Sequence, residues 1–294
     1  MAVIVIKDFN LDFIGIGAQK AGTTWLANHL AKHPSICMSE PKEINYFNEK
    51  GSFARSYANK NHAKPFSWYK KHFAHCKKGQ LRGEFSTSYL YDRKAPVLIQ
   101  KHFPKIKLIV CLRNPIDRAY SQYWMLKNYL KLESRTFERA IEEEHEYVWR
   151  GMYYKQLKHF LKYFKKEQIL VVMFDDIKKR PELTLKRVFK FLHISENIAG
   201  KVSLEKSNPS KKVKFGSITA AMGLVSKTLV NLRLSFLLRM LKYIGVKKII
   251  MKLNTSEFKY DGMDAEVRKE LRLKFKKDIK NLEKLLDRDL SHWR

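Results

Sequence analysis

The stretch Leu11-Asp-Phe-Ile-Gly-Ile-Gly-Ala-Gln-Lys-Ala-Gly-Thr-Thr24 decides the fold of this chain. Its first part, residues 11–17, is mainly apolar and ends in glycine, which predicts a short buried strand. Residues 23–32 predict a helix that begins directly after the second glycine of the loop. Between the strand and the helix, Gly17 and Gly22 have the Gly-x-x-x-x-Gly spacing of a phosphate-binding loop.

Strands and helices alternate along the rest of the chain. The apolar runs 106–112 and 168–174 predict two further strands. The predicted helices are 115–129, 153–164, 181–192 and 264–286. This alternation predicts the α/β class, in a P-loop-like three-layer α/β/α arrangement around a central parallel sheet. Such sheets bind ligands where loops leave the carboxyl ends of the strands.

We expect residues 1–294 to form a single domain, with a helical C-terminal part from about residue 217. The segment 217–252 is apolar and basic. A helix that covers the core is the favoured interpretation, and peripheral contact with a membrane surface stays open. The apolar stretch after Met1 is only about four residues long, too short for a signal peptide or a membrane span. This favours a cytoplasmic protein without a transmembrane segment.

The net charge of the chain is +30. A surface this basic attracts a phosphorylated cofactor, an acidic polysaccharide, nucleic acid or an anionic membrane. Lysines far outnumber arginines and are spread along the chain, so a solvated basic surface explains the charge equally well. No nucleic-acid-binding motif is present, and we expect no specific nucleic-acid partner. The sequence gives no indication of the oligomeric state.

Cys37, Cys76 and Cys111 are the only cysteines. Their odd number and wide spacing predict neither a disulfide framework nor a metal cluster. Cys111 lies inside an apolar run and is expected to be a small buried hydrophobic residue.

The glycine loop departs from that of nucleotide triphosphatases. Those enzymes need a lysine directly after the second glycine, to reach the β- and γ-phosphates, and a Ser or Thr on Mg²⁺. Here Thr23 follows Gly22, and Lys20 lies inside the loop. This layout suits a 5′-phosphate held by backbone amides and hydroxyls, with Lys20 near a bridging oxygen. An ordinary glycine turn before a helix is the alternative.

A second anion site is predicted after the strand 106–112. Arg113 ends that strand and can present its planar fork to a phosphate. Ser121, two turns into the following helix, can offer a hydroxyl to the same group. Arg118 is assigned a structural role beside Asp117 or another carboxylate. Two anion sites on two loops of one parallel sheet fit a ligand that is phosphorylated at two places.

This pair of sites resembles the two donor-binding signatures of the family of sulfotransferases that use 3′-phosphoadenosine-5′-phosphosulfate (PAPS). One signature binds the 5′-phosphosulfate and the other the 3′-phosphate. The segment 41–47, Pro-Lys-Glu-Ile-Asn-Tyr-Phe, looks like the one that carries the catalytic carboxylate in the heparan-sulfate-type and bacterial carbohydrate branch. The resemblance covers nearly the whole chain, loosely between motifs. Further fitting motifs are 83–89, 151–153, 174–177 and 289–293.

The resemblance implies sulfuryl transfer from PAPS to an acceptor hydroxyl or amine, with PAP as product and without a metal. The first choice of acceptor is a carbohydrate, and other hydroxyl-bearing metabolites stay open. Glu43 is implied as general base, Lys20 as the cation on the leaving group, and Lys42 and Ser86 as substrate-binding residues. The donor-binding residues implied are Gly17, Gln19, Lys20, Ala21, Gly22, Thr23, Thr24, Trp25, Arg113, Ser121, Tyr153 and Lys211.

Two departures and two alternatives accompany this interpretation. The Lys-Thr-His segment of the small-molecule cytosolic branch is absent, and Phe85 stands where many relatives have a lysine. A P-loop kinase or ATPase is favoured only by Asp175 and Asp176, which follow an apolar run as a Mg²⁺-binding aspartate would. A non-enzymatic polyanion-binding protein is favoured only by the net charge.

Overall fold

The computed structural model describes residues 9–49, 59–196, 211–213, 221, 228, 250, 253–258 and 260–294. The chain divides into two compact units. The larger contains 1–122, 137–207 and 263–294, and the smaller contains 123–136 and 208–262. A single domain stays a prediction, and the helical part expected from about residue 217 lies almost wholly outside the described residues. In the described part, no helix has the length and apolar character needed to cross a bilayer.

The larger unit is built on a five-stranded sheet in which every neighbouring pair is parallel. The order is β2-β3-β1-β4-β5, with bounds Phe13–Gly17 for β1, Ile36–Met38 for β2, Leu81–Phe85 for β3, Lys107–Leu112 for β4 and Ile169–Met173 for β5. The three strands expected from apolar runs are therefore confirmed. The two strands that the sequence missed are β2, which has only three residues, and β3, which carries charged and glycine residues.

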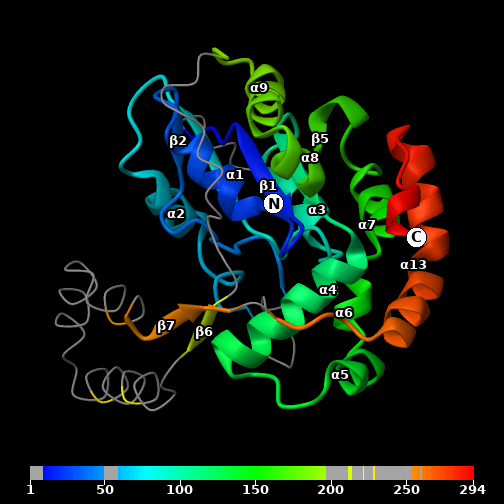
Figure 1. Cartoon of the computed structure of the whole chain (residues 1–294). Helices are drawn as coiled ribbons and strands as arrows, with labels where there is room; N and C mark the ends of the chain where they lie inside the picture. The colour runs from blue at the N-terminus through cyan, green and yellow to red at the C-terminus, as the bar shows by residue number, and fades with distance from the viewer. Residues whose placement is uncertain are drawn as a thin grey trace. The chain divides into compact units, whose positions relative to one another are not determined.

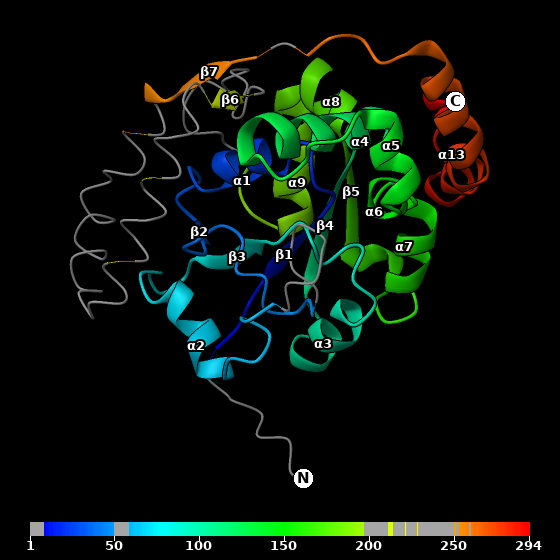
Figure 2. The same cartoon turned by 90° about the horizontal axis from the view of Figure 1, so that it is seen from below.

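Helices cover both faces of this sheet (Figures 1 and 2), which confirms the three-layer α/β/α fold. On one face lie α1 (Thr23–Leu30), α8 (Phe174–Lys179) and α9 (Pro181–Leu192). On the other lie α3 (Ala95–His102) and α7 (Tyr153–Phe160). The other short helices of this unit are α2 (Phe66–Lys70), η1 (Lys71–Phe73), α4 (Pro115–Trp124, whose last two residues belong to the smaller unit), α5 (Phe137–Glu143), α6 (Glu146–Trp149), η3 (Lys166–Gln168) and η4 (Ser291–Trp293).

The long helix α13 (Ala265–Leu286) packs against α7. Its buried Asp278 accepts hydrogen bonds from the backbone N–H groups of Tyr154 (2.9 Å) and Lys155 (3.2 Å). A carboxylate at these N–H groups satisfies donors that have no partner inside α7, so α13 caps the neighbouring helix. Asp264 caps α13 itself, because its side chain accepts from the second and third N–H groups of the helix.

Two glycines let β1 and β3 pack closely. The strands pair with Phe13 opposite Gly83 and Gly15 opposite Phe85. A Cβ atom placed on Gly15 would lie 1.9 Å from the Phe85 ring, and one on Gly83 would lie 2.1 Å from the Phe13 ring. Each aromatic ring therefore covers the glycine of the neighbouring strand, and Phe85 is fully buried.

Most helix predictions agree with the structure apart from their ends. The prediction 181–192 coincides with α9, and 264–286 starts one residue before α13. The helix predicted at 153–164 ends at Phe160. The helix predicted at 115–129 is α-helical only to Trp124 and continues as the π-helical segment η2 (Met125–Leu130).

The described part of the smaller unit contains a two-stranded antiparallel ladder, β6 (Lys211–Val213) with β7 (Thr255–Glu257). The strand β6 contacts η2. The ring of Trp124 lies parallel to that of Tyr260, with centroids 6.0 Å apart. Packing of η2 and aromatic stacking therefore support this short ladder.

The prediction that the chain holds no disulfide is wrong. Cys37 of β2 and Cys76, just after η1, are joined, with their Cα atoms 5.5 Å apart and a sequence separation of 39. The pair could not be predicted from this spacing, because β2 and the segment after η1 become neighbours only in the folded chain. The ring of His75 lies beside the bond, with ligand atoms of all three residues within 4.8 Å of one another. Joined sulfurs supply no thiolate for a metal. The third cysteine, Cys111, is fully buried as predicted.

Candidate active site

The loop between β1 and α1 leaves the start of α1 open to an anion. Gly22 precedes the helix with φ at +91°, a conformation that strains any residue with a side chain. A Cβ atom there would also lie 2.9 Å from side-chain atoms of both Phe174 and Ile177 in α8. No side chain caps α1, and its first turn carries no acidic residue. The N–H groups at this end of the helix can therefore hold a phosphate.

Lys20 lies at the centre of the loop with φ at +67°. Burial and the nearby charge of Arg113 lower the pKa of Lys20 to about 8. The neighbouring Gln19 is almost fully buried, and its Oε1 has no hydrogen-bond partner among the described residues. Of the other residues assigned to the donor here, Gly17, Ala21, Thr23 and Trp25 are buried, and Thr24 is partly exposed.

Arg113 follows β4, the strand that pairs with β1, so the two predicted anion sites meet at one edge of the sheet. Its Nη1 donates to the backbone carbonyl of Lys20 at 3.3 Å. Its guanidinium lies over the ring of Phe174, 5.0 Å from the centroid. Among the described residues, no carboxylate forms an ion pair with Arg113 or Lys20. The charge of Arg113 acts on Lys20, and an anionic ligand would stabilise two neighbouring cations that have no carboxylate partner among the described residues.

The residues around Arg113 hold its backbone in place. Asn114 caps α4, since its Oδ1 accepts from the N–H of Ile116 at 3.0 Å. Tyr153 is fully buried, and its hydroxyl donates to the carbonyl of Arg113 at 2.9 Å. Burial raises the pKa of Tyr153 to about 12. Tyr153 therefore supports the loop after β4 and has its hydroxyl occupied. Ser121 lies on α4 and is largely buried.

Arg118 is structural, as expected, but its predicted partner is wrong. It is fully buried and donates to Gln122 Oε1 at 2.7 Å and to the carbonyl of Tyr147. Asp117 instead forms an ion pair with Arg268 of α13, at 2.8 Å. The last predicted phosphate contact, Lys211, lies in β6, of which only the backbone course is described.

Glu43 follows β2 and is held from two sides. Lys42 Nζ lies 3.1 Å from Oε1, and the hydroxyl of Thr87 donates to Oε2 at 3.1 Å. One third of the Glu43 side chain remains exposed. Lys42 also lies over the face of Phe85, 5.9 Å from the ring centroid. The candidate base is thus oriented by the protein and still open to a second molecule.

Glu84 is a site residue that the sequence reasoning missed. It is fully buried in β3. Oε1 accepts from the hydroxyls of Tyr69 (2.9 Å) and Tyr89 (3.0 Å), and Oε2 accepts from Ser86 (2.8 Å). The backbone N–H of Ile44 also donates to this carboxylate. Burial raises the pKa of Glu84 to about 7, although the four hydrogen bonds favour the ionised form.

Ser86, assigned to the substrate by the resemblance, lies inside this same network. It has no exposed surface, and its hydroxyl both donates to Glu84 and accepts from the N–H of Asn45 at 2.9 Å. Its hydroxyl therefore holds the loop that follows Glu43 and is not presented to a ligand in this structure.

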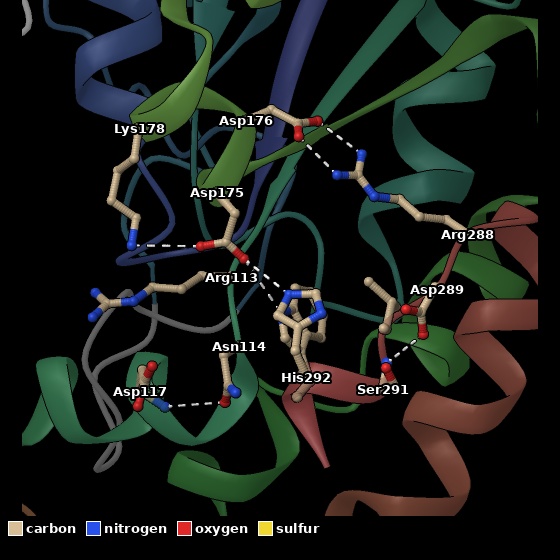
Figure 3. A network of polar contacts seen from close by, with 12 residues as sticks. Arg113, Asn114, Asp117, Asp175, Asp176, Lys178, Arg288, Asp289, Ser291 and His292 are labelled. Atoms are coloured by element: carbon tan, nitrogen blue, oxygen red, sulfur yellow. Dashed lines mark hydrogen bonds and ion pairs between the residues drawn. The ribbon is translucent and has the colours of Figure 1, made fainter.

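Asp175 and Asp176 bind the C-terminal turn (Figure 3). Asp176 receives two hydrogen bonds from Arg288, at 2.8 and 2.7 Å, and these lower the pKa of its carboxyl. Asp175 lies 3.5 Å from Lys178 and 3.3 Å from His292. Carboxylates engaged in this way hold η4 and the residues before it against α8. The feature that favoured a Mg²⁺-dependent kinase thus has a packing role.

Comparisons with known proteins show the family to which this chain belongs. The family model described as "Sulfotransferase domain" matches residues 11–230. The chain is 29% identical over 195 residues to heparan sulfate glucosamine 3-O-sulfotransferase 5 of Mus musculus, which covers 63% of this chain and 54% of that protein. It is 34% identical over 145 residues to the membrane-associated sulfotransferase kil1 of Dictyostelium discoideum, covering 47% of this chain and 28% of that protein. The chain therefore spans about half, or less, of the length of these relatives.

A solved structure shares the fold over nearly the full length. The sulfotransferase from Alicyclobacillus acidocaldarius superposes with a TM-score of 0.71 at 23% identity, and the match covers 97% of this chain and 99% of that one. The family model covers well over half of the chain, and it includes the loop of Lys20, the Glu43 segment and the loop of Arg113. The chain belongs to the sulfotransferase domain family.

Proposed function

We propose that this protein transfers a sulfuryl group from PAPS to a hydroxyl or amine of an acceptor, with a carbohydrate as first choice. The observation that carries the proposal is the pair Lys20 and Arg113, two cations on adjacent strand exits without a carboxylate partner in the described residues. A ligand that carries phosphate groups at two places, one for each loop, would neutralise both.

The residues at the two loops fit such a donor. The open N-terminus of α1, with Thr23 and Thr24, offers amide and hydroxyl donors to the 5′ side. The Oε1 of Gln19 is a buried acceptor that lacks a partner in the described part of the chain, so it would accept from an O–H or N–H group of the donor and not from a phosphate. Arg113, with Ser121 on the next helix, would bind the 3′-phosphate. No residue in this set needs a metal ion to bind phosphate.

The bound donor supplies a sulfur atom joined through oxygen to its 5′-phosphate. Glu43 accepts the proton that the acceptor hydroxyl loses as its oxygen bonds to sulfur. Lys20 stabilises the negative charge that collects on the phosphate oxygen as the bond from that oxygen to sulfur breaks. Thr87 and Lys42 hold the Glu43 carboxylate in one orientation, which favours in-line attack.

A carbohydrate acceptor is supported by the relatives, one of which is named for heparan sulfate glucosamine. The net charge of +30 would steer an acidic polymer toward the enzyme. Lys42, beside the base, would contact an anionic group on the acceptor. The cytoplasmic location stays a prediction. The disulfide of Cys37 and Cys76 is more typical of oxidising compartments, so fractionation of cells is the test.

Calorimetric titration with PAP, the desulfated donor, tests the proposal, with ATP and Mg²⁺ as the competing ligand. We expect metal-independent binding that Arg113→Ala weakens by about a hundredfold. Arg272→Ala, which removes the same charge from an exposed position on α13, should leave binding unchanged.

Preference for Mg²⁺-ATP would contradict the proposal and favour a kinase. Binding of any polyanion with equal affinity, abolished by salt, would favour a non-enzymatic polyanion-binding protein. Where PAP binds, transfer of label from PAPS to desulfated heparan polymers, compared with aryl alcohols, decides the class of acceptor.

A further inference from the structure

Successive backbone N–H groups directly after Glu43 converge on one buried carboxylate. The N–H of Ile44 donates to Glu84 itself. The N–H of Asn45 donates to the hydroxyl of Ser86 at 2.9 Å, and that hydroxyl donates to Glu84 Oε2 at 2.8 Å. The first two residues after the candidate base are therefore tied to the same anion, one directly and one through a single hydroxyl.

The next two N–H groups reach the same carboxylate through one tyrosine. The hydroxyl of Tyr89 accepts from Tyr46 at 2.9 Å and from Phe47 at 3.4 Å, and it donates to Glu84 Oε1 at 3.0 Å. Asn45 has φ at +51°, and a left-handed residue between neighbours lets consecutive N–H groups point to one side. Chains of hydrogen bonds that end on a charge polarise and strengthen one another.

Hydrogen bonds alone compensate the charge of Glu84. Its side chain is fully buried, and in the described part of the chain no lysine, arginine or histidine contacts it. The titratable groups that touch it are Tyr89 and, from α2, Tyr69. Both tyrosines keep their protons, because burial and the Glu84 charge raise the pKa of each well above its usual value. A buried carboxylate that accepts four hydrogen bonds and has no cationic partner fixes the positions of the groups that donate to it.

We propose that Glu84 is the positioning residue of this active site: its ionised carboxylate anchors the segment Ile44–Phe47 and thereby fixes where Glu43 points. The same unit holds Glu43 from the other side, since Thr87, which bonds the base, follows Ser86 in the chain. The consequence for turnover rests on the function proposed above, whereas the anchoring itself does not.

The anchor is sensitive to pH. Burial raises the pKa of Glu84 to about 7. A protonated carboxyl must use one oxygen as a donor, so it can no longer accept all four hydrogen bonds. We therefore expect the segment after Glu43 to loosen as the pH falls below about 7.

Amide hydrogen exchange of the whole chain tests the anchoring, with two tyrosine variants as a matched pair. Tyr89→Phe and Tyr69→Phe each remove one buried hydroxyl that bonds Glu84 Oε1. Only the Tyr89 hydroxyl also accepts hydrogen bonds from backbone N–H groups of the loop. At about pH 8, above the pKa of Glu84, residues 44–47 should exchange about tenfold faster in Glu84→Gln and in Tyr89→Phe, but as in wild type in Tyr69→Phe. Amides of β4 serve as the reference for global stability.

Kinetics supply the second readout. We expect kcat to fall by about tenfold or more in Glu84→Gln and Tyr89→Phe, while the Kd for PAP changes by less than about twofold. In the wild type we expect kcat to fall as the pH drops through about 7, and this pH dependence should be absent in Glu84→Gln. Wild-type exchange at 44–47 in a folded Glu84→Gln, or equal effects of the two tyrosine variants, overturns the proposal.

The tyrosine pair decides the matter if Glu84→Gln does not fold. Faster exchange at 44–47 in a protein that turns over no acceptor would instead reject the sulfuryl-transfer function and leave the anchoring intact.

Discussion

Arg113 donates a hydrogen bond to the backbone carbonyl of Lys20, with Nη1 3.3 Å from the oxygen, and so joins the exits of β4 and β1. The contact brings two positive groups together. Burial and the charge of Arg113 lower the pKa of Lys20 to about 8. The loop after β1 thus holds a lysine that loses its proton at mildly basic pH, near its pKa of about 8.

Binding of PAP should therefore take up protons near pH 8. An anionic ligand favours the charged form of Lys20 and raises its pKa above the unbound value of about 8, so affinity falls as the pH rises through that value. Calorimetry in two buffers of different ionisation enthalpy measures the uptake. Arg113→Ala should reduce it, because the Lys20 pKa then starts higher. Binding without proton exchange in the wild type would contradict the assigned position of Lys20.

Glu43→Gln should reduce kcat by about a hundredfold to a thousandfold, because it removes the proton acceptor. The affinity for PAP should stay near the wild-type level, since the contacts of the Glu43 carboxylate are Lys42 and Thr87 and its proposed role is toward the acceptor. Glu40→Gln is the matched control, as an exposed carboxylate in the same loop. Equal effects of the two substitutions on kcat would show that the negative charge of the loop, rather than proton transfer to Glu43, determines the rate.

The parts of the fold that the sequence predicts are those where one pattern dominates. The apolar run of β4 and the strand-glycine-helix order of 11–32 can be recognised because a strand buried on both faces is continuously apolar. The strand β5 has a similar apolar run, although its first three residues are partly exposed. The strand β3 was not predicted because Gly83 and Glu84 interrupt its apolar pattern. Both residues are tolerated in the buried strand through contacts with other parts of the chain: the Phe13 ring covers Gly83, and hydroxyl groups donate hydrogen bonds to Glu84.

The site was predictable to the extent that its residues sit in local motifs. Lys20 and Arg113 each follow a predicted strand, so their positions suggested a role, whereas Glu43 was assigned through the resemblance of the segment 41–47. Glu84 lies within the motif 83–89, but its role depends on its burial and on the loop N–H groups that reach it through Ser86 and Tyr89. The disulfide of Cys37 was missed for the same reason, since its partner is distant in sequence. Long-range partners of buried polar groups are what a single sequence does not reveal.

Removal of the Arg288 side chain should loosen the C-terminal turn. The guanidinium binds Asp176 through two hydrogen bonds, and both side chains are partly exposed, at 38% and 22%. We therefore expect Arg288→Ala to lower the free energy of unfolding by only about 1 kcal/mol. Arg288→Lys should recover a part of it, because a lysine lacks the fork. Chemical denaturation measures both, and full stability in Arg288→Ala would show that the pair contributes nothing.

Glu84 should make the protein less stable as the pH rises. Its pKa in the folded state, about 7, lies above the usual value of 4.5 for a glutamate in the unfolded chain. The folded state therefore holds the proton more tightly than the unfolded state does. The stabilising contribution is complete below pH 4.5 and is lost as the pH rises through about 7. The loss is at most about 3 kcal/mol, and Glu84→Gln should flatten the profile between these values. If the stability of the variant changed with pH as steeply as that of the wild type, a group other than Glu84 would be the one that titrates.

Reduction of the Cys37–Cys76 disulfide should destabilise the folded chain. The bond closes a loop across 39 residues, and the chain-entropy argument gives at most about 4 kcal/mol for a loop of this length. Denaturation with and without reductant measures the loss in wild type, and Cys37→Ser should show the reduced value in both conditions. Alkylation of the unfolded, unreduced protein should label Cys111 alone. Labelling of all three cysteines before reduction would show that the two sulfurs are not joined. The stability difference should then be absent, because nothing would restrict the unfolded chain between β2 and the segment after η1.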